Sequence, residues 1–216
     1  IKLDAIRQGL RTFDTTFFQA PGRMNVYDEH PFKVLFDYGH NAAAVAAMAD
    51  LAQRLDVAGR RIVVVAGPGD RRDEDLVAIA EAVAGRFDHY ICRRDDALRG
   101  RDGDEVPQII ARALVAAGVD KAAIEQIPDE QQAIDAALRM GQPGDLILIF
   151  ADALVRSWKQ IIKFRAEGAP AKPARAPAPV VPVPASEAVF DEASFAALGG
   201  IVRDERGISL LRESDD

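Results

Sequence analysis

The chain has 216 residues and 49% hydrophobic content, enough for one domain of ordinary size with a buried core and a tail. A formal net charge of −7 argues against non-specific nucleic-acid binding as the main task, and we expect no nucleic-acid partner. The one cysteine, Cys92, excludes an internal disulfide and fits a cytoplasmic location. No apolar run approaches the ~20 residues of a membrane span, so we expect no membrane partner.

Apolar runs alternate along the chain with segments of helical periodicity, which is typical of strand–helix–strand units in a parallel sheet. The runs carry Val, Ile, Leu and Phe with little alternation, as expected for strands covered on both faces. Strands are predicted at 33–38, 61–66, 89–93, 124–127 and 145–151, and helices at 41–55, 73–86, 105–117, 129–140 and 153–165. We therefore expect an α/β fold with a Rossmann-like, mostly parallel sheet flanked by helices, and a buried Cys92 in its third strand.

The composition changes at Gly168, which ends the domain predicted for residues 1–167. Residues 168–185 contain six prolines and six alanines, which predicts an extended, semi-rigid linker. Residues 186–216 hold eight acidic and three basic side chains, and we expect a flexible acidic tail there. The alternative is a docking helix, built on an apolar set that comprises Val189, Phe190, Phe195, Leu198, Ile201 and Val202.

The second predicted strand runs into two glycines and a charge cluster, Gly67-Pro-Gly69 followed by Asp70-Arg71-Arg72. The carboxyl ends of parallel strands form the usual ligand edge of an open α/β sheet. Two arginines beside the amide groups of a helix N-terminus suit a phosphate or a carboxylate. The third glycine of a dinucleotide fingerprint is missing, which disfavours a Rossmann dehydrogenase. The alternative for this segment is a solvated charged loop.

The first predicted strand ends in Asp37-Tyr-Gly-His40-Asn41, which places a carboxylate, an imidazole and an amide at a strand-to-helix corner. These groups suit a bound polar ligand, although Asn41 is also a good N-cap and capping alone would explain it. Upstream, Pro21-Gly-Arg23 is a short and common sequence that adds one arginine. No metal site is predicted, because the three histidines and the carboxylates do not show a metal-ligand spacing.

The third predicted strand is followed by a stretch that mixes four arginines with two carboxylates, Arg93 to Arg101. Asp95 or Asp96 would accept a bidentate hydrogen bond from a guanidinium or ammonium substrate. The alternative is an exposed loop whose ion pairs contribute little. No Gly-Lys-Ser/Thr sequence occurs, so the chain has anion-binding groups without the P-loop of a complete phosphoryl-transfer site.

Taken in chain order, these motifs resemble the C-terminal domain of the Mur ligase superfamily, and within it the Mur-ligase-like part of cyanophycin synthetases. The resemblance covers about residues 1–165 and extends to Phe150-Ala-Asp152 and Ser157-Trp158-Lys159. Each motif is short, whereas the ordered set is specific. One departure is that the usual Asp-Tyr-Ala-His-Asn-Pro reads Asp37-Tyr-Gly-His-Asn-Ala42, which loosens the corner and removes a rigid helix start.

The resemblance implies an ATP-dependent amide ligase, in which ATP phosphorylates a carboxylate and an amine attacks the acyl phosphate. This domain would be a lid on a preceding P-loop central domain, which would hold most Mg²⁺ ligands. In cyanophycin synthetase, arginine is added to the β-carboxyl of a polymer aspartate. Because the chain begins at Ile1 rather than at a methionine, we expect it to be a piece of such a longer protein, which we expect to be a homo-oligomer.

Roles follow for the residues that match the family motifs. Asp37 would hold the ribose, His40 and Asn41 would lie beside the nucleotide, and Arg23 would reach a phosphate. Arg71 or Arg72 would face the γ-phosphate or the acceptor carboxylate as the catalytic group. The substrate-binding residues would be Gly69, Asp70, Asp95, Asp96 and Arg99.

Two other classes of function remain open at the level of sequence. One is a degenerate Mur-like scaffold, as in relatives that polymerise β-aspartyl-arginine with a separate ATP-grasp domain. The other is a free-standing α/β binding module.

Overall fold

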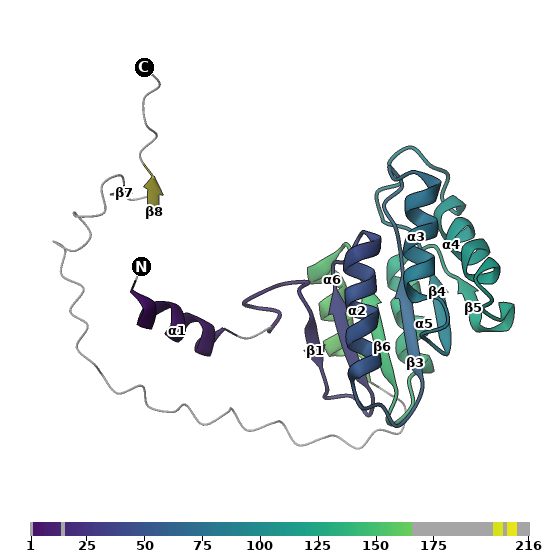
Figure 1. The fold of residues 1–216 in the computed structure, drawn as a ribbon, viewed down its shortest axis with the longest axis horizontal. Coiled ribbons are helices and arrows are strands. Elements are labelled where there is room, and N and C mark those ends of the chain that lie inside the picture. Colours follow the sequence, from purple (N-terminus) through teal and green to yellow (C-terminus); the bar gives the residue numbers. More distant parts are fainter. Residues whose placement is uncertain (1, 14–15, 166–200, 205–206, 211–216) are drawn as a thin grey trace. The chain divides into compact units, whose positions relative to one another are not determined.

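The structure, a computed structural model, describes residues 2–13, 16–165, 201–204 and 207–210. The chain divides into two compact units, Ile1–Lys172 and Pro173–Asp216. The predicted linker, residues 168–185, lies outside the described residues, as does most of the predicted tail. Figure 1 shows the larger unit as a twisted sheet with helices on both faces.

Six strands form the sheet of the larger unit in the order β1-β2-β6-β3-β4-β5. The five predicted strands are all present, and their pairings β2–β6, β6–β3, β3–β4 and β4–β5 are parallel. The sequence did not predict β1, a three-residue edge strand that pairs antiparallel with β2. The bounds are β1 Asn25–Tyr27, β2 Lys33–Asp37, β3 Arg61–Val65, β4 His89–Cys92, β5 Ile124–Gln126 and β6 Leu146–Phe150.

The helices that connect the strands cover both faces of this sheet (Figure 1). α2 (Ala42–Arg54), α3 (Asp73–Val83) and α4 (Glu105–Ala116) pack on one face, whereas α5 (Glu130–Met140) and α6 (Leu154–Lys163) pack on the other. A short 3₁₀ turn, η1 (Lys121–Ala123), precedes β5. None of the helices in the described part of the chain is long and apolar enough to cross a bilayer. The mostly parallel α/β fold predicted from the sequence is confirmed.

Alternate residues of each central strand face opposite helix layers, because successive strand side chains point to opposite faces. In β6, Leu148 packs with the α2–α4 layer, and Ile147 and Ile149 pack with the α5–α6 layer. All three are fully buried. Cys92 is buried in β4, as predicted, and burial raises the pKa of its thiol to about 12.

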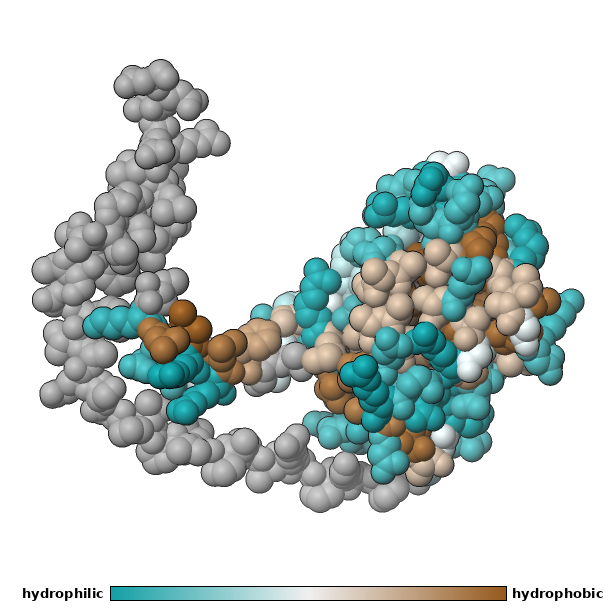
Figure 2. All heavy atoms as spheres, viewed as in Figure 1, coloured by the Kyte–Doolittle hydropathy of each residue, from teal (hydrophilic) through white to brown (hydrophobic). Residues whose placement is uncertain are grey.

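The segment before β1 contains an unpredicted helix, α1 (Leu3–Thr12), which has no buried residue. Its side chains are a mixture of hydrophobic and hydrophilic residues, seen as brown and teal spheres in Figure 2. Further along, Phe17 stacks on Trp158 of α6, with ring centroids 4.9 Å apart and planes only 3° from parallel. This contact attaches the start of the domain to its last helix.

The smaller unit contains a two-stranded antiparallel sheet made of β7 (Ile201–Asp204) and β8 (Gly207–Leu210). Two members of the apolar set suggested for a docking helix, Ile201 and Val202, therefore lie in a strand. The other members of that set lie outside the described residues.

The packing of β6 predicts a large loss of stability for Ile149→Ala. Removing a fully buried aliphatic side chain costs about 2–5 kcal/mol, because transfer free energy is lost and a cavity remains. Urea unfolding of the purified chain measures this cost. Val155→Ala in α6 is the control, because Val155 is 56% exposed and its truncation is expected to cost about 0.5 kcal/mol or less. Equal losses in the two variants would contradict this account of the core.

We propose that the folded domain ends before residue 168, as the change in composition predicts. A chain truncated after Gly168 keeps both faces of the six-stranded sheet covered, since α6 ends at Lys163. We expect its thermal unfolding midpoint to lie within about 2 °C of the full chain, which corresponds to at most about 1 kcal/mol for a domain of this size. A drop of 10 °C would mean that the second unit stabilises the first.

Candidate functional site

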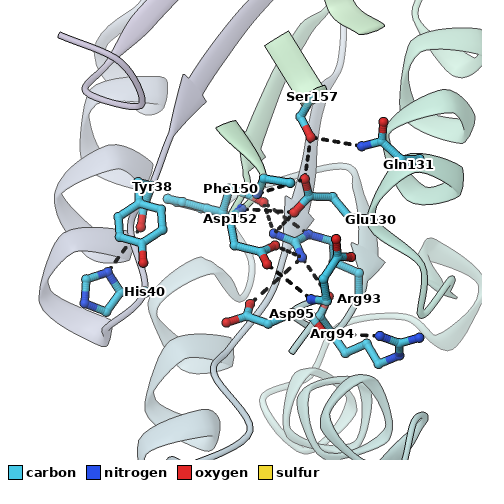
Figure 3. A network of polar contacts seen from close by, with 12 residues as sticks. Tyr38, His40, Arg93, Arg94, Asp95, Glu130, Gln131, Phe150, Asp152 and Ser157 are labelled. Atoms are coloured by element: carbon cyan, nitrogen blue, oxygen red, sulfur yellow. Dashed lines mark hydrogen bonds and ion pairs between the residues drawn. The ribbon is translucent and has the colours of Figure 1, made fainter. Parts of the chain in front are cut away.

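The candidate site lies along the carboxyl ends of β2, β6, β3 and β4, where parallel strands bring their following loops to one edge. Asp37 is paired in register with Phe150, and Val65 is paired with Cys92. The loops that follow these four strands therefore converge, and they carry the residues selected from the sequence. Figure 3 shows part of this edge, with Tyr38 and His40 on one side of the buried Arg93.

The β2 corner is a compact polar turn. The carboxylate of Asp37, which is 8% exposed, accepts the amide of Met24 at 2.8 Å and that of Gly39 at 2.7 Å. His40 Nδ1 lies 3.2 Å from the carbonyl oxygen of Tyr38. Asn41 accepts the amide of Ala44 at 3.0 Å, so it is the N-cap of α2. These hydrogen bonds hold the backbone of the corner from Asp37 to Asn41 in one conformation.

Arg23 lies beside the same corner. Its guanidinium carbon is 5.8 Å from the ring centroid of Tyr38, and that ring is 5.0 Å from the His40 ring. The backbone turn before Arg23 needs glycine, because Gly22 has φ +66° and a Cβ there would meet the Leu154 side chain at 2.7 Å. The structure thus brings Arg23, Asp37 and His40 together, as the sequence order suggested.

The two arginines of the β3–α3 loop differ in their partners. Arg72 makes a bidentate ion pair with Asp75, at 3.1 and 3.0 Å. The guanidinium of Arg71 makes no hydrogen bond or ion pair with any residue that the structure describes, and Arg71 lines a pocket with His40, Asn41 and Asp75. The hydrogen bond from Arg72 is the main cause that lowers the pKa of the Asp75 carboxyl, and the charge of Arg71 adds to this effect. Arg71 is therefore the one of the two that is available to an anion.

This pocket is small. Its volume of about 100 Å³ is well below the ~300 Å³ at which small-molecule sites begin. A second pocket of about 10 Å³, enough for about one water molecule, lies between Tyr38, Arg93 and Asp152. Neither pocket is large enough to enclose a small-molecule ligand.

Two charged residues of the loop after β4 form ion pairs with other elements. Arg99 lies 3.2 Å from Asp70 of the β3–α3 loop, and Asp96 pairs with Arg156 of α6. These pairs connect the loop to its neighbours. Asp95 differs because it is only 8% exposed and lies 3.9 Å from Arg93, and burial raises the pKa of its carboxyl.

Arg93 is the centre of a buried polar network (Figure 3). Its side chain is 1% exposed, and Nε and Nη2 donate to the carbonyl of Phe150 at 3.2 and 2.8 Å. Nη1 donates to Asp152 at 2.9 Å and Nη2 lies 2.9 Å from Glu130. The side chain of Arg93, directly after β4, therefore binds the carbonyl group at the carboxyl end of β6, across the intervening strand β3.

Glu130 caps the first turn of α6 from the neighbouring helix. Its carboxylate accepts the amides of Asp152 at 2.9 Å and Ala153 at 3.3 Å, and the Ser157 hydroxyl donates to it. α6 needs this help because its N-cap, Ala153, has no side-chain oxygen. Burial and the nearby Asp152 carboxyl raise the pKa of Glu130 to about 7. Burial also acts to raise the pKa of Asp152, but its hydrogen bond with Glu130 and the charge of Arg93 outweigh this effect and lower it.

The sequence analysis did not single out Arg93, Glu130 or Arg101 for a role. Arg93 ends an apolar run and Glu130 begins a helix, and both patterns are common at exposed positions. Their partners lie 22 to 59 residues away in sequence, so no local pattern predicts the contacts. The one available signal was an arginine placed directly at the end of a buried strand.

No group of three or more His, Cys, Asp or Glu side chains in the described part of the chain is arranged to hold a metal ion. Glu130 and Asp152 do not fit Mg²⁺, because they already bind Arg93 and backbone amides. A phosphate group fits better, since Arg71 has no ion pair among the described residues and the one carboxylate in its pocket, Asp75, is neutralised by Arg72.

Residues 22–153 match the family model described as Mur ligase, glutamate ligase domain. The chain belongs to this Mur ligase family. It is 40% identical over 164 residues to the cyanophycin synthetase of Geminocystis herdmanii, which covers 76% of this chain and 18% of that protein. It is 32% identical over 152 residues to the UDP-N-acetylmuramyl-tripeptide synthetase of Latilactobacillus sakei. This match covers 69% of this chain and 28% of that protein.

Solved structures of other ligases share the fold of this Mur ligase domain. Mycobacterium tuberculosis folylpolyglutamate synthase complexed with ADP superposes with a TM-score of 0.55 at 20% identity, over 77% of this chain and 36% of that one. The E. coli FolC structure with ADP superposes with a TM-score of 0.56 at 21% identity, over 75% of this chain and 35% of that one. The chain spans about a fifth of the length of the cyanophycin synthetases that it matches. The resemblance predicted from the ordered motifs is confirmed.

The raised pKa of Glu130 predicts a pH dependence of stability. Between its unfolded value of 4.5 and about 7, the folded state binds more protons than the unfolded state, so the contribution of Glu130 falls as pH rises. We expect the free energy of unfolding of the wild type, minus that of Glu130→Gln, to be larger at pH 5 than at pH 8. Urea unfolding at the two pH values measures it.

The control is Glu81→Gln, which removes the same charge from an exposed position in α3. Its difference from the wild type should change little between the two pH values. A Glu130 difference that stays constant between pH 5 and pH 8 would contradict this prediction, because it would mean that the carboxyl is ionised throughout this range.

Proposed function

We propose that the chain is the C-terminal lid domain of an ATP-dependent acid–amino-acid ligase of the cyanophycin synthetase type. One observation carries the proposal: Arg71, whose guanidinium makes no hydrogen bond or ion pair with any described residue, lines a small pocket with His40 and Asn41 at the carboxyl edge of the sheet. Asp75, which lines the same pocket, is held by Arg72. A pocket of about 100 Å³ is one wall of a nucleotide site, which needs a second wall from another domain. Relatives about five times longer than this match have room for that domain.

In the proposed reaction, a carboxylate attacks the γ-phosphorus of ATP and ADP leaves. The amine then attacks the acyl phosphate, the new C–N bond forms, and inorganic phosphate leaves with the electrons of the broken C–O bond. Arg71 would bind the transferred phosphoryl group and offset its negative charge, which is the main task of a protein in phosphoryl transfer. Arg72 is engaged by Asp75, so we assign the catalytic contact to Arg71.

The nucleotide would lie against the β2 corner. Arg23 would reach a phosphate, and His40 and Asn41 would line the nucleotide. Both carboxylate oxygens of Asp37 already accept backbone amides, so a ribose hydroxyl would donate to a remaining lone pair. ATP is the proposed cofactor, with Mg²⁺ held mainly by the preceding P-loop domain. A cytoplasmic homo-oligomer is the proposed state of the full-length protein.

For the incoming amine we propose arginine, which would be added to the β-carboxyl of an aspartate polymer. Asp95 is the better placed acceptor for its guanidinium, because Asp96 and Asp70 form close ion pairs with Arg156 and Arg99. Asp95 lies 3.9 Å from Arg93, which is held more closely by Glu130 and Asp152. Arg99 and the backbone at Gly69 and Asp70 would frame the same subsite. A bidentate carboxylate–guanidinium contact gives both affinity and orientation.

A degenerate scaffold is the second candidate. The observation that favours it is the extent of internal pairing, since Asp37, Asp70, Asp96 and Arg99 all have partners within the domain. Such a domain would hold its protein together while another domain polymerises β-aspartyl-arginine. It would leave ATP turnover independent of Arg71.

The deciding experiment measures phosphate release by the full-length protein with ATP, an aspartate-polymer primer and arginine, after any upstream ATP-grasp site is disabled. We expect Arg71→Gln to lower kcat by at least about 100-fold, as for the loss of one preorganised donor to transition-state charge. Arg112→Gln removes the same charge from an exposed site in α4 and should leave kcat within twofold.

The scaffold alternative predicts another result. Arginine would then cause no phosphate release, whereas β-aspartyl-arginine would support release by the protein with its ATP-grasp site intact. Arginine-dependent release that is unchanged by Arg71→Gln would overturn the role assigned to Arg71.

A further inference from the structure

Arg101 connects the two loops that carry the proposed substrate contacts. Its side chain is 16% exposed, and Nε donates to the carbonyl of Gly69 at 2.9 Å. Nη2 donates to the carbonyl of Arg71 at 2.7 Å and to Asp73 at 2.7 Å, while Nη1 donates to Glu105. The partners thus comprise two backbone carbonyls of the β3–α3 loop, a carboxylate at the start of α3 and a carboxylate at the start of α4.

The same two loops touch through their backbones. A Cβ at Gly69 would lie 2.1 Å from the carbonyl oxygen of Leu98, so only glycine allows this approach. The turn that follows Leu98 is tight, since Arg99 has φ +51° and Gly100 has φ +91°. It places Arg101 directly under the β3–α3 loop. All three nitrogens of Arg101 donate to protein groups and its side chain is 16% exposed, so its contacts are structural.

The Arg71 carbonyl is the key partner. Arg71 has its amide bonded to Pro68 at 3.1 Å and its carbonyl bonded to Arg101, so both polar groups of its backbone are fixed. Its guanidinium makes no hydrogen bond or ion pair with any described residue, and Arg71 lines the pocket with His40, Asn41 and Asp75. We infer that Arg101 is a positioning residue, which holds the backbone of Arg71 so that its guanidinium faces this pocket.

The inference rests on the proposed function, in which Arg71 binds the transferred phosphoryl group. If Arg101 acts through Arg71, then removing it matters only while Arg71 is present. A residue that bound substrate itself, or that only stabilised the fold, would lower activity equally in both backgrounds. A double-mutant cycle separates these cases.

The first measurement is hydrogen exchange of the 216-residue chain over residues 69–73. We expect Arg101→Gln to speed exchange there by at least about tenfold. Without Arg101, a local opening of this segment no longer has to break the two hydrogen bonds to the carbonyls of Gly69 and Arg71. Arg112→Gln removes the same charge from an exposed position of α4 and should leave this segment unchanged. Unchanged exchange in Arg101→Gln would overturn the inference, whatever the outcome for catalysis.

The second measurement is the cycle of Arg71→Gln and Arg101→Gln in the phosphate-release assay of the full-length protein. We expect Arg101→Gln alone to lower kcat at least about tenfold, since a displacement of ~1 Å can cost ~100-fold. In the Arg71→Gln background the further loss should be less than about twofold. An equal loss in both backgrounds would overturn the inference while leaving the proposed function intact.

If Arg71→Gln alone leaves turnover unchanged, the proposed function of Arg71 fails, and hydrogen exchange alone decides the positioning role. If Arg101→Gln does not fold, Asp73→Asn replaces it in both measurements. The Asp73 side chain is 66% exposed, and the substitution removes only one partner of Arg101. The same directions are expected with smaller effects, and an Asp73→Asn chain with unchanged exchange and equal losses in both backgrounds would overturn the inference.

Discussion

The buried guanidinium of Arg93 is the interaction on which the carboxyl edge of this domain depends. A charge that is 1% exposed is tolerable only with full compensation, and Glu130, Asp152 and the carbonyl of Phe150 supply it. Through these partners Arg93 joins the end of β4 to the end of β6 and to the start of α6. The loops on either side of this network carry the remaining polar residues of the site. The positions of these loops therefore depend on Arg93, whose side chain is 1% exposed.

Around this fixed centre, the arginines of the edge divide into two kinds. Arg72, Arg99 and Arg156 are committed to carboxylates of the same domain, and Arg101 to the loops. Arg71 and Arg23 lack a carboxylate partner in the described part of the chain, and both lie next to the β2 corner. Two arginines without a carboxylate partner among the described residues thus lie at one corner of the sheet of a net-acidic domain. This separation of paired from unpaired arginine supports an anion site far better than the number of arginines does.

Local patterns were sufficient to predict the five parallel strands, their helices and the edge at which the loops meet, because period and strand-end chemistry are properties of short segments. The sequence did not predict β1 or α1, because an element with few buried residues leaves little hydrophobic pattern. β1 has three residues and one buried side chain, and α1 has no buried side chain. The loops were found from the sequence, but the roles within them were not. Arg71 and Arg72 are equivalent in sequence, and only the position of Asp75 distinguishes them. Glu130 and Arg101 act through partners on other elements, which a linear pattern does not specify.

The strand order has a consequence for how such a domain comes into being during synthesis. β6 lies between β2 and β3, although it follows both of them by about 80 residues or more in the chain. Until Phe150 has left the ribosome, β2 and β3 have no shared neighbour, and the carbonyl that Arg93 needs does not exist. The six-stranded sheet is therefore incomplete until β6 has been made, because β6 pairs with both β2 and β3. Folding of this sheet waits for residues that lie in the final quarter of the domain.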